Sequence, residues 1–464
     1  MALTNNGRDI TNKLQKDPIT ENDYVLYDDL NEETLDQFIK LHTRESERLK
    51  DFKNQYEGRP PIVFEKDKES WKPDNRLIAN FGKYIVDTFN GYFTGIPVKV
   101  SHDNDEIDYR IQTFWNSNNL DDLVSELSKL TSIYGKAYLY MYQDENSNTG
   151  VSIASPLDTF LIYSSDIRHT PIYGVRWTNA NEKRGVLISS TSYTEFYYDS
   201  KNQLKFGDEK EHYFNQLPII EFVENREKLS LIAPVETLIN AFNQTLSEKA
   251  NDTDYFADAY LKVLGVEIED DASFDIRDSR IINLFSRGGG DLKGIDVGFL
   301  EKPDGDTTQE NLLNRLEDLI YRLSMVANIN DESYGNASGT ALEFKLQPMK
   351  NLAKMKERKY VTSLNKMFEI WLGIESLKIS RDIKDEWVNI NYKFTLNMPR
   401  NIESEADAVQ KLNGTISDET LLSLLSFIDN PKQEIEKMKE EQEENMPRGS
   451  TYITDRGMQD ESWI

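Results

Sequence analysis

Two helical patterns flank a polar, glycine-bearing segment, Asn328-Ile329-Asn330-Asp331-Glu332-Ser333-Tyr334-Gly335-Asn336-Ala337-Ser338-Gly339. The upstream pattern covers residues 306–327. It opens with Thr307 and Glu310 at capping-box spacing, and leucine, isoleucine and valine then recur at helical spacing. The segment itself is too polar and carries too much glycine to continue the helix. The sequence therefore predicts a capped helix that ends in a loop.

The downstream pattern predicts a longer helix. Thr340 and Glu343 form a second capping box, and an apolar side continues to about Gly373. Pro348 lies inside this helix, where its missing N–H group and its ring are expected to cause a kink. Two capped helices around a polar loop hold that loop at a fixed place.

Composition limits the function classes. The chain has 464 residues, a formal net charge of −27 and no cysteine, which excludes disulfides and thiolate metal sites. No apolar run approaches the roughly 20 residues of a membrane helix, and the N-terminus does not resemble a signal peptide. The acidic charge argues against electrostatic wrapping of nucleic acid, which requires clustered lysine and arginine.

No catalytic, cofactor or metal site is predicted. The four histidines are far apart in the sequence and never occur at i, i+4 spacing: His42, His102, His169 and His212. The triple glycine at 288–290 lacks the Gly-Lys-Ser/Thr ending of a phosphate-binding loop. The carboxylates at 103–108 lack the glycine and the distal glutamate of a calcium loop, so a solvated helix start is the better interpretation.

The N-terminal half predicts a flexible or extended arm at 1–30, followed by helices and then strands. The helices are expected at 32–56, 76–93, 104–115 and 120–134, with a short strand at 98–101. From residue 136 the apolar period changes to two, and residues 136–225 are predicted to be β-rich. The expected strands are 137–142 and 151–153, which form a hairpin, and 159–163, 172–178, 185–199, 204–206 and 219–223.

A long helix is predicted from Pro234 to Val263, with an apolar side and a polar side. The polar side includes Asn243, Ser247 and Asn251 and is expected to face water. A compact mixed insert follows at 264–305. Its strands are expected at 265–268, 280–285 and 297–300, with a short helix at 273–277.

The C-terminal part predicts one strand at 387–395 and two small helices. The first helix starts at Ser417, and the second has Pro431 at its first position. Beyond residue 440 the acidic, apolar-poor tail is expected to be disordered. The one basic concentration, which includes Lys345, Lys350 and Lys354, has two interpretations: contact with DNA or a neighbouring subunit, or a solvated helix side paired with Glu357 and its neighbours.

The order of these parts resembles the portal proteins of tailed bacteriophages, in particular the siphovirus type that infects Gram-positive bacteria. The similarity covers about residues 20–440. It rests on Gly91-Tyr92-Phe93-Thr94-Gly95-Ile96-Pro97-Val98, Tyr134-Gly135-Lys136-Ala137-Tyr138, Pro218-Ile219-Ile220-Glu221-Phe222, Asn251-Asp252-Thr253-Asp254-Tyr255-Phe256-Ala257-Asp258-Ala259-Tyr260 and Ser338-Gly339-Thr340-Ala341-Leu342. Each stretch alone is weakly specific, and their order carries the resemblance.

The resemblance implies an α+β portal fold with named parts. These are a flexible arm (1–30), a wing (31–233, β-rich at 136–225), stem helix 1 (234–263), a small α/β clip (264–305), stem helix 2 (306–327), a tunnel loop (328–339), a long kinked helix with a wing strand (340–400), a helical crown (401–440) and an acidic flexible tail (441–464).

The resemblance also implies a role. Portal proteins form a ring, usually of twelve subunits, at one vertex of the phage head. Double-stranded DNA passes through this ring, and terminase, major capsid and scaffolding proteins and a head–tail connector contact it. The protein would assemble in the host cytoplasm and remain in the virion, without membrane contact or enzymatic activity.

Two groups of site residues follow as expectations. The DNA-facing loop residues are Asn328, Asn330, Asp331, Ser333, Tyr334 and Asn336. The docking loop of the clip is Arg287, Gly288, Gly289, Gly290 and Asp291. The main alternative is a tail or baseplate structural protein that never contacts DNA, and an enzyme of unknown chemistry is a more distant one.

Overall fold

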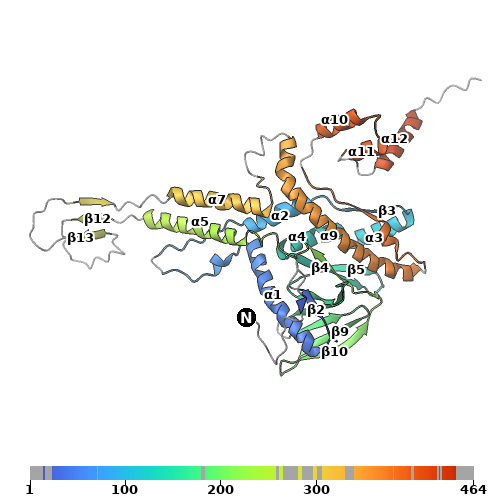
Figure 1. Ribbon diagram of the computed structural model, residues 1–464, viewed down its shortest axis with the longest axis horizontal. Coiled ribbons are helices and arrows are strands. Elements are labelled where there is room, and N and C mark those ends of the chain that lie inside the picture. Colours follow the sequence, from blue (N-terminus) through green and yellow to red (C-terminus); the bar gives the residue numbers. More distant parts are fainter. Residues whose placement is uncertain are drawn as a thin grey trace, which may run out of the picture. The chain divides into compact units, whose positions relative to one another are not determined.

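The computed structural model (Figure 1) describes residues 14–15, 23–69, 72–178, 183–257, 261–264, 281–284, 296–299, 306–329, 339–379, 381–398, 402–425, 428 and 431–445. The chain divides into two compact units, one up to Asn397 and one from Met398 onward.

Four helices in the N-terminal part of the first unit lie close to the positions that the apolar periodicity predicts. Their bounds are α1 Glu32–Tyr56, α2 Phe81–Thr94, α3 Asp105–Ser117 and α4 Leu120–Tyr134, with a short 3-10 turn, η2, at Pro61–Phe64. The side chains of Asn31, Asn80 and Asn104 each accept a backbone N–H bond and cap α1, α2 and α3. The start predicted for α2 at Arg76 is wrong, because the preceding residues are extended along another helix.

The larger sheet has seven strands in the order β1-β2-β6-β7-β8-β9-β10. Their bounds are β1 Leu14–Gln15, β2 Asp23–Leu26, β6 Thr159–Ser164, β7 Pro171–Thr178, β8 Arg184–Ile188, β9 Ser192–Tyr198 and β10 Leu204–Glu211. The single strand predicted at 185–199 is wrong. Ser189 interrupts it, because its hydroxyl accepts the N–H groups of Thr191 and Ser192 and turns the chain between β8 and β9.

A second sheet, ordered β11-β4-β5, packs on the first. Its strands are β4 Lys136–Gln143, β5 Thr149–Ala154 and β11 Ile219–Val223, and the predicted hairpin is confirmed. Alternation along β6 explains the layers. Phe160 and Ile162 face the core beneath α1, whereas Leu161 and Tyr163 face the second sheet.

The sequence predicts a flexible or extended arm at 1–30, and for residues 23–26 only the extended alternative holds, because they form β2. This strand pairs in parallel with β6, and its Val25 is fully buried. Asp23 at its start accepts a hydrogen bond from Lys228 at 2.7 Å and pairs with His169 at 3.1 Å. The sequence gives no period because the strand is short and its first buried residue is an ion-paired aspartate.

Two long helices, α5 Glu236–Ala257 and α7 Asp306–Ser324, lie side by side (Figure 1). Lys249 of α5 pairs with Glu310 of α7. The prediction that the first helix reaches Val263 is wrong: α5 spans roughly 33 Å rather than about 45 Å, and Leu261–Leu264 forms the strand β12 instead.

The prediction that the polar side of α5 faces water is wrong for three of its residues. Asn243 and Ser247 are 1% exposed and Asn251 is 6% exposed. Their side chains accept the backbone N–H groups of the extended segment before α2: Ala79 to Asn243 at 2.8 Å, Leu77 to Ser247 at 3.0 Å and Asn75 to Asn251 at 2.6 Å. We call this arrangement the α5 polar ladder. It satisfies backbone groups that would otherwise be buried without partners.

The insert contains one described sheet, ordered β13-β12-β14. Its strands are β12, β13 Ile281–Leu284 and β14 Asp296–Phe299, whereas the strand predicted at 265–268 lies outside the described residues. β12 pairs with a strand on each side, so its backbone groups are hydrogen-bonded in the sheet. This pairing outweighs the apolar pattern that predicts a helix up to Val263. The helix predicted at 273–277 lies outside the described residues.

The long helix α9 runs from Gly339 to Ile379 and contains Pro348. Its first turns run in a different direction from the rest (Figure 1), as the predicted kink requires. The predicted end at Gly373 is wrong. Gly373 does not adopt the left-handed conformation that ends many helices, and the buried side continues with Ile374, which is 3% exposed.

The remaining elements of the first unit are η3 Glu386–Asn389, β15 Ile390–Lys393 and β3 Lys99–His102, and β15 pairs with β3. The second unit contains α10 Ile402–Leu412, α11 Asp418–Ser423 and α12 Pro431–Asn445. The Ser417 cap and the helix start at Pro431 are confirmed. The periodicity missed α10, and α12 extends beyond the expected limit of 440.

The α5 polar ladder predicts a local stability effect. Asn243→Ala removes a buried side chain that accepts the N–H of Ala79. We expect the free energy of unfolding to fall by about 1–3 kcal/mol. Urea unfolding and hydrogen exchange at the Ala79 amide measure this loss. The control is Gln244→Ala at the exposed neighbouring position, which should change the free energy of unfolding by no more than about 0.5 kcal/mol. Equal effects of the two substitutions would contradict the ladder.

Candidate functional site

The loop singled out by the sequence begins at a fixed point. α7 ends where Met325 adopts the left-handed conformation with φ of 59°, and Val326 is then 1% exposed. The Tyr84 hydroxyl on α2 donates to the carbonyl oxygen of Ala327 at 3.2 Å and accepts the N–H of Ile329 at 2.9 Å. One hydroxyl therefore holds two backbone groups at the start of the loop.

The structure describes one of the loop residues predicted to approach DNA, Asn328, which is half-buried. Five others lie outside the described residues: Asn330, Asp331, Ser333, Tyr334 and Asn336. The predicted docking loop of the clip also lies outside them: Arg287, Gly288, Gly289, Gly290 and Asp291.

The basic residues on α9 have different environments. Lys345 is half-buried, whereas Lys350 and Lys354 are exposed. Lys354 pairs with Glu357 at 2.6 Å, which is the solvated pairing that the sequence offered as an alternative. A contact of these lysines with DNA or with a neighbouring subunit stays a prediction.

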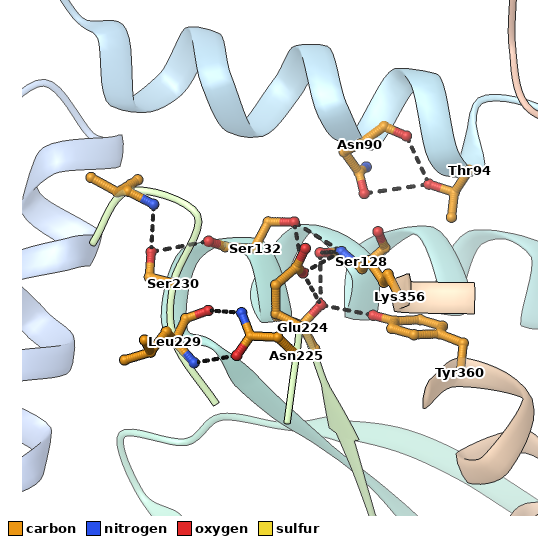
Figure 2. Close-up of polar contacts among 12 residues, drawn as sticks. Asn90, Thr94, Ser128, Ser132, Glu224, Asn225, Leu229, Ser230, Lys356 and Tyr360 are labelled. Carbon is orange, nitrogen blue, oxygen red and sulfur yellow. Dashed lines mark hydrogen bonds and ion pairs between the residues drawn. The ribbon is translucent and has the colours of Figure 1, made fainter. Parts of the chain in front are cut away.

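Lys356, in the same basic run, is fully buried and forms an ion pair with Glu224 at 2.5 Å. Its ammonium also donates to the carbonyl oxygen of Ser128 and to the hydroxyl of Ser132, both at 2.9 Å. Figure 2 shows Lys356 and Tyr360 reaching from α9 toward Glu224. All three N–H donors are used, which is the geometry of a charged lysine.

Aromatic rings also lie around the Lys356 ammonium. The Lys356 ammonium lies 5.2 Å from the ring centroid of Phe89 and 5.4 Å from that of Phe93, within cation–π range. Burial lowers the pKa of Lys356 because it disfavours the charged form, and Glu224 partly offsets this effect. Burial also raises the pKa of Tyr360, whose hydroxyl lies 2.8 Å from that of Thr131.

The carboxylate is positioned by the end of α4. Gly135 ends that helix with φ of 86°, and its carbonyl oxygen accepts the N–H of Glu224 at 2.9 Å. A Cβ at Gly135 would lie 2.0 Å from the carbonyl oxygen of Lys228, so only glycine fits beneath the returning chain. The Ser132 carbonyl oxygen then accepts the Ser230 hydroxyl at 3.1 Å.

The sequence does not reveal this pair directly, because Lys356 belongs to a run of basic residues. The position of Lys356 in the helical pattern is the signal that could have revealed the pair. Met349, Ala353 and Tyr360 are buried at helical spacing, and residue 356 falls on the same side of α9. A lysine on a buried stripe predicts an acidic partner.

His42 is buried: its Nδ1 accepts from Trp177 Nε1 and its Nε2 donates to the carbonyl oxygen of Pro156, both at 2.9 Å. Burial lowers the pKa of His42 to about 4, so it is neutral at pH 7. Among the described residues, no group of three or more histidine or acidic side chains could hold a metal ion.

The sequence matches the family described as phage portal protein, SPP1 Gp6-like, over residues 35–448. The chain belongs to this family. It is 22% identical over 421 residues to the portal protein of Bacillus phage SPP1, covering 84% of this chain and 80% of that relative. It is 24% identical over 393 residues to the portal protein of Clostridium phage phiCD119, covering 79% of this chain and 84% of that relative.

Among solved structures, the neck of an empty GTA particle, computed with C6 symmetry, matches at 12% identity with a TM-score of 0.45. The match covers 75% of this chain and 90% of that chain, and at this score it carries no argument.

Membership in the portal family confirms the predicted α+β portal fold and the predicted kind of phage, since the two relatives come from phages of Gram-positive bacteria. It decides against the tail or baseplate protein. A portal protein is a structural component of the virion that assembles as a ring. Within the described part of this portal protein, none of the helices has the length and apolar character needed to cross a bilayer.

The buried ion pair predicts a large asymmetry between neighbouring lysines. Lys356→Met leaves the Glu224 carboxylate buried without a counter-charge, and we expect a loss of about 3–5 kcal/mol in the free energy of unfolding. Lys354→Met, which breaks an exposed pair, should cost about 0–1 kcal/mol. Chemical denaturation of both variants measures the difference.

The double variant Lys356→Met, Glu224→Gln should recover part of the loss, because it removes the unpaired charge. If the single variant does not fold, soluble yield of the double variant relative to the single one provides the readout. A Lys356→Met variant as stable as Lys354→Met would contradict this account of the pair.

Proposed function

We propose that this portal protein forms a ring of twelve subunits at one vertex of the phage head and that double-stranded DNA passes through it during packaging and ejection. The observation that carries this proposal is the family match over residues 35–448. Within this role, residues 31–233 form the wing, α5 and α7 the stem, 264–305 the clip and 401–440 the crown.

The partners follow from this position in the particle. We assign terminase and a head–tail connector to the clip, including its loop at 287–291, and major capsid and scaffolding proteins to the outer parts. Assembly takes place in the host cytoplasm. The role is structural, and no catalytic group is assigned.

The charge of the chain suits a channel that must release DNA. Twelve subunits of −27 each would carry a formal charge of about −320, which repels phosphates from most of the wall. Tight electrostatic contact would hold the DNA in place, whereas weak contact allows it to move. Acidity, which argued against nucleic-acid binding, is therefore compatible with DNA transport.

The tunnel loop is the proposed point of closest approach. Residues 328–339 contain no lysine or arginine, and their amide, hydroxyl and phenol groups can make neutral or water-mediated contacts. Two observations support a fixed position for its ends: the Tyr84 hydroxyl holds the start, and the Lys356 pair anchors the helix that follows.

The basic residues Lys345, Lys350 and Lys354 lie shortly after this loop. We propose that they contact DNA or the neighbouring subunit. Lys354 has a competing intrahelical partner in Glu357, which weakens any such contact of that lysine.

Deleting residues 330–337 tests the loop assignment. We expect the variant to form rings visible in negative-stain images and to package little DNase-protected DNA, because the deletion leaves the stem and wing intact. A control with Glu145→Ala and Asn146→Ala in the exposed turn between β4 and β5 should package normally. A deletion variant that loses the ring, or that packages like the wild type, would contradict the assignment.

A further inference from the structure

The apolar side of α7 is wider than its contact with α5 requires. Leu313, Leu316 and Ile320 are buried, with exposures of 6%, 7% and 0%. Beside them, Leu312 is 47% exposed and Leu323 is 50% exposed. The helix therefore carries apolar side chains that the described part of its own chain does not cover.

These exposed residues form a stripe. Leu312, Leu319 and Leu323 are separated by seven and four positions, which places them on one side of a helix over about 16 Å. Leu319, in the middle, is half-buried. We call these three residues the outer leucine stripe. Single exposed leucines are ordinary on a surface, whereas an aligned row along a helix indicates a partner.

Charged residues border the stripe on one flank. Arg315 and Arg322 have side chains that are each 63% exposed, and both pair with Asp318 on the same helix. Two arginines share one carboxylate, so this flank carries an excess of positive charge. The partner that covers the stripe should therefore be small or neutral at its centre and acidic at its edge.

The side of α5 away from the α5 polar ladder has these properties. Thr237, Ala241 and Gln244 are exposed on it, and the two smaller side chains allow another helix to approach closely. Glu248 continues the same side; its carboxylate is 44% exposed and already pairs with Lys68 at 3.0 Å. This free side of α5 complements the outer leucine stripe in size, and Glu248 is the acidic group at its edge.

We infer that, in the ring, the outer leucine stripe of one subunit packs on the free side of α5 of the neighbouring subunit. This inference rests on the proposed ring and adds the surface that closes the stem. The contact is heterologous, because a stripe on α7 meets a different surface on α5, and repeated heterologous contacts generate a ring.

Symmetry gives the register. Rotation about the ring axis preserves height, so residues at the same level of the stem meet if the stem runs along that axis. Phe81 contacts both Phe242 of α5 and Tyr321 of α7, which places these two residues at similar levels. α5 and α7 run in opposite directions, so these contacts and the Lys249–Glu310 pair place Leu319 between the levels of Asn240 and Gln244. Ala241 is the small exposed residue in this range, and it should contact Leu319 across the subunit boundary.

The first experiment replaces the ends of the stripe with charges. Leu312→Glu together with Leu323→Glu should shift the protein from rings to folded monomers in sedimentation velocity, with the circular dichroism spectrum unchanged. The matched control, Asn311→Glu together with Asn314→Glu on the exposed polar side of α7, adds the same charge and should keep the ring.

The second experiment uses the absence of cysteine from the chain. Leu319→Cys combined with Ala241→Cys should give, on mild oxidation, a covalent ladder of dimers and higher multiples in non-reducing gels. A bond within one subunit would leave only monomer, so the ladder reports contact between neighbours. Asn314→Cys combined with Ala241→Cys is the control and should give no ladder.

The outcomes are distinguishable. The inference is supported if the wild type forms rings, the cysteine variant gives a ladder, and the Leu312→Glu, Leu323→Glu variant is monomeric. If the wild type forms rings, the cysteine variant gives no ladder and the Leu312→Glu, Leu323→Glu variant keeps the ring, this interface is overturned. The proposed function then still stands. A wild-type protein that forms no ring overturns the proposed function and the interface with it.

Discussion

Burying an ammonium and a carboxylate is unfavourable unless each finds its full set of partners. Lys356 and Glu224 meet that condition at one position of α9, where the lysine uses all three donors and is surrounded by the rings of Phe89 and Phe93. Sliding α9 by one turn would bury both charges unpaired. The pair therefore fixes the position of α9 along its axis, and with it the place at which this helix begins after residues 328–339.

Helix α5 obeys a related constraint. Asn243, Ser247 and Asn251 accept the backbone N–H groups of the extended segment before α2, so this segment covers that side of the helix. α7 covers a second side. The free side of α5 is what remains for a neighbouring subunit, and the outer leucine stripe of α7 is the apolar surface that matches it. Three sides of α5 thus have three different partners in our account.

Much of the fold was predictable from sequence periodicity. α1, α4 and β11 occur where the apolar patterns place them, because each buries one regular side. The α5 polar ladder was not predictable in this way. A polar stripe has the same sequence whether water or a backbone segment covers it, and only the folded chain shows that the segment before α2 does so.

The candidate site shows the same limit. Neighbouring basic residues in the sequence hide the position of Lys356 on the buried side of α9. Its partner Glu224 is distant in sequence, so no local pattern connects them. The strand pair β8 and β9 was merged because Ser189 turns the chain through a side-chain hydrogen bond, which alternation of residues does not reveal.

The central claim is that residues 328–339 line the channel that DNA passes through. A photo-crosslinking amino acid in place of Tyr334 tests it most directly, with crosslinks to DNA measured in filled and in empty heads. Our account predicts DNA crosslinks in filled heads, and none when the same amino acid replaces the exposed Tyr109 of α3. Equal crosslinking at the two positions, or no DNA crosslink from position 334, would contradict it.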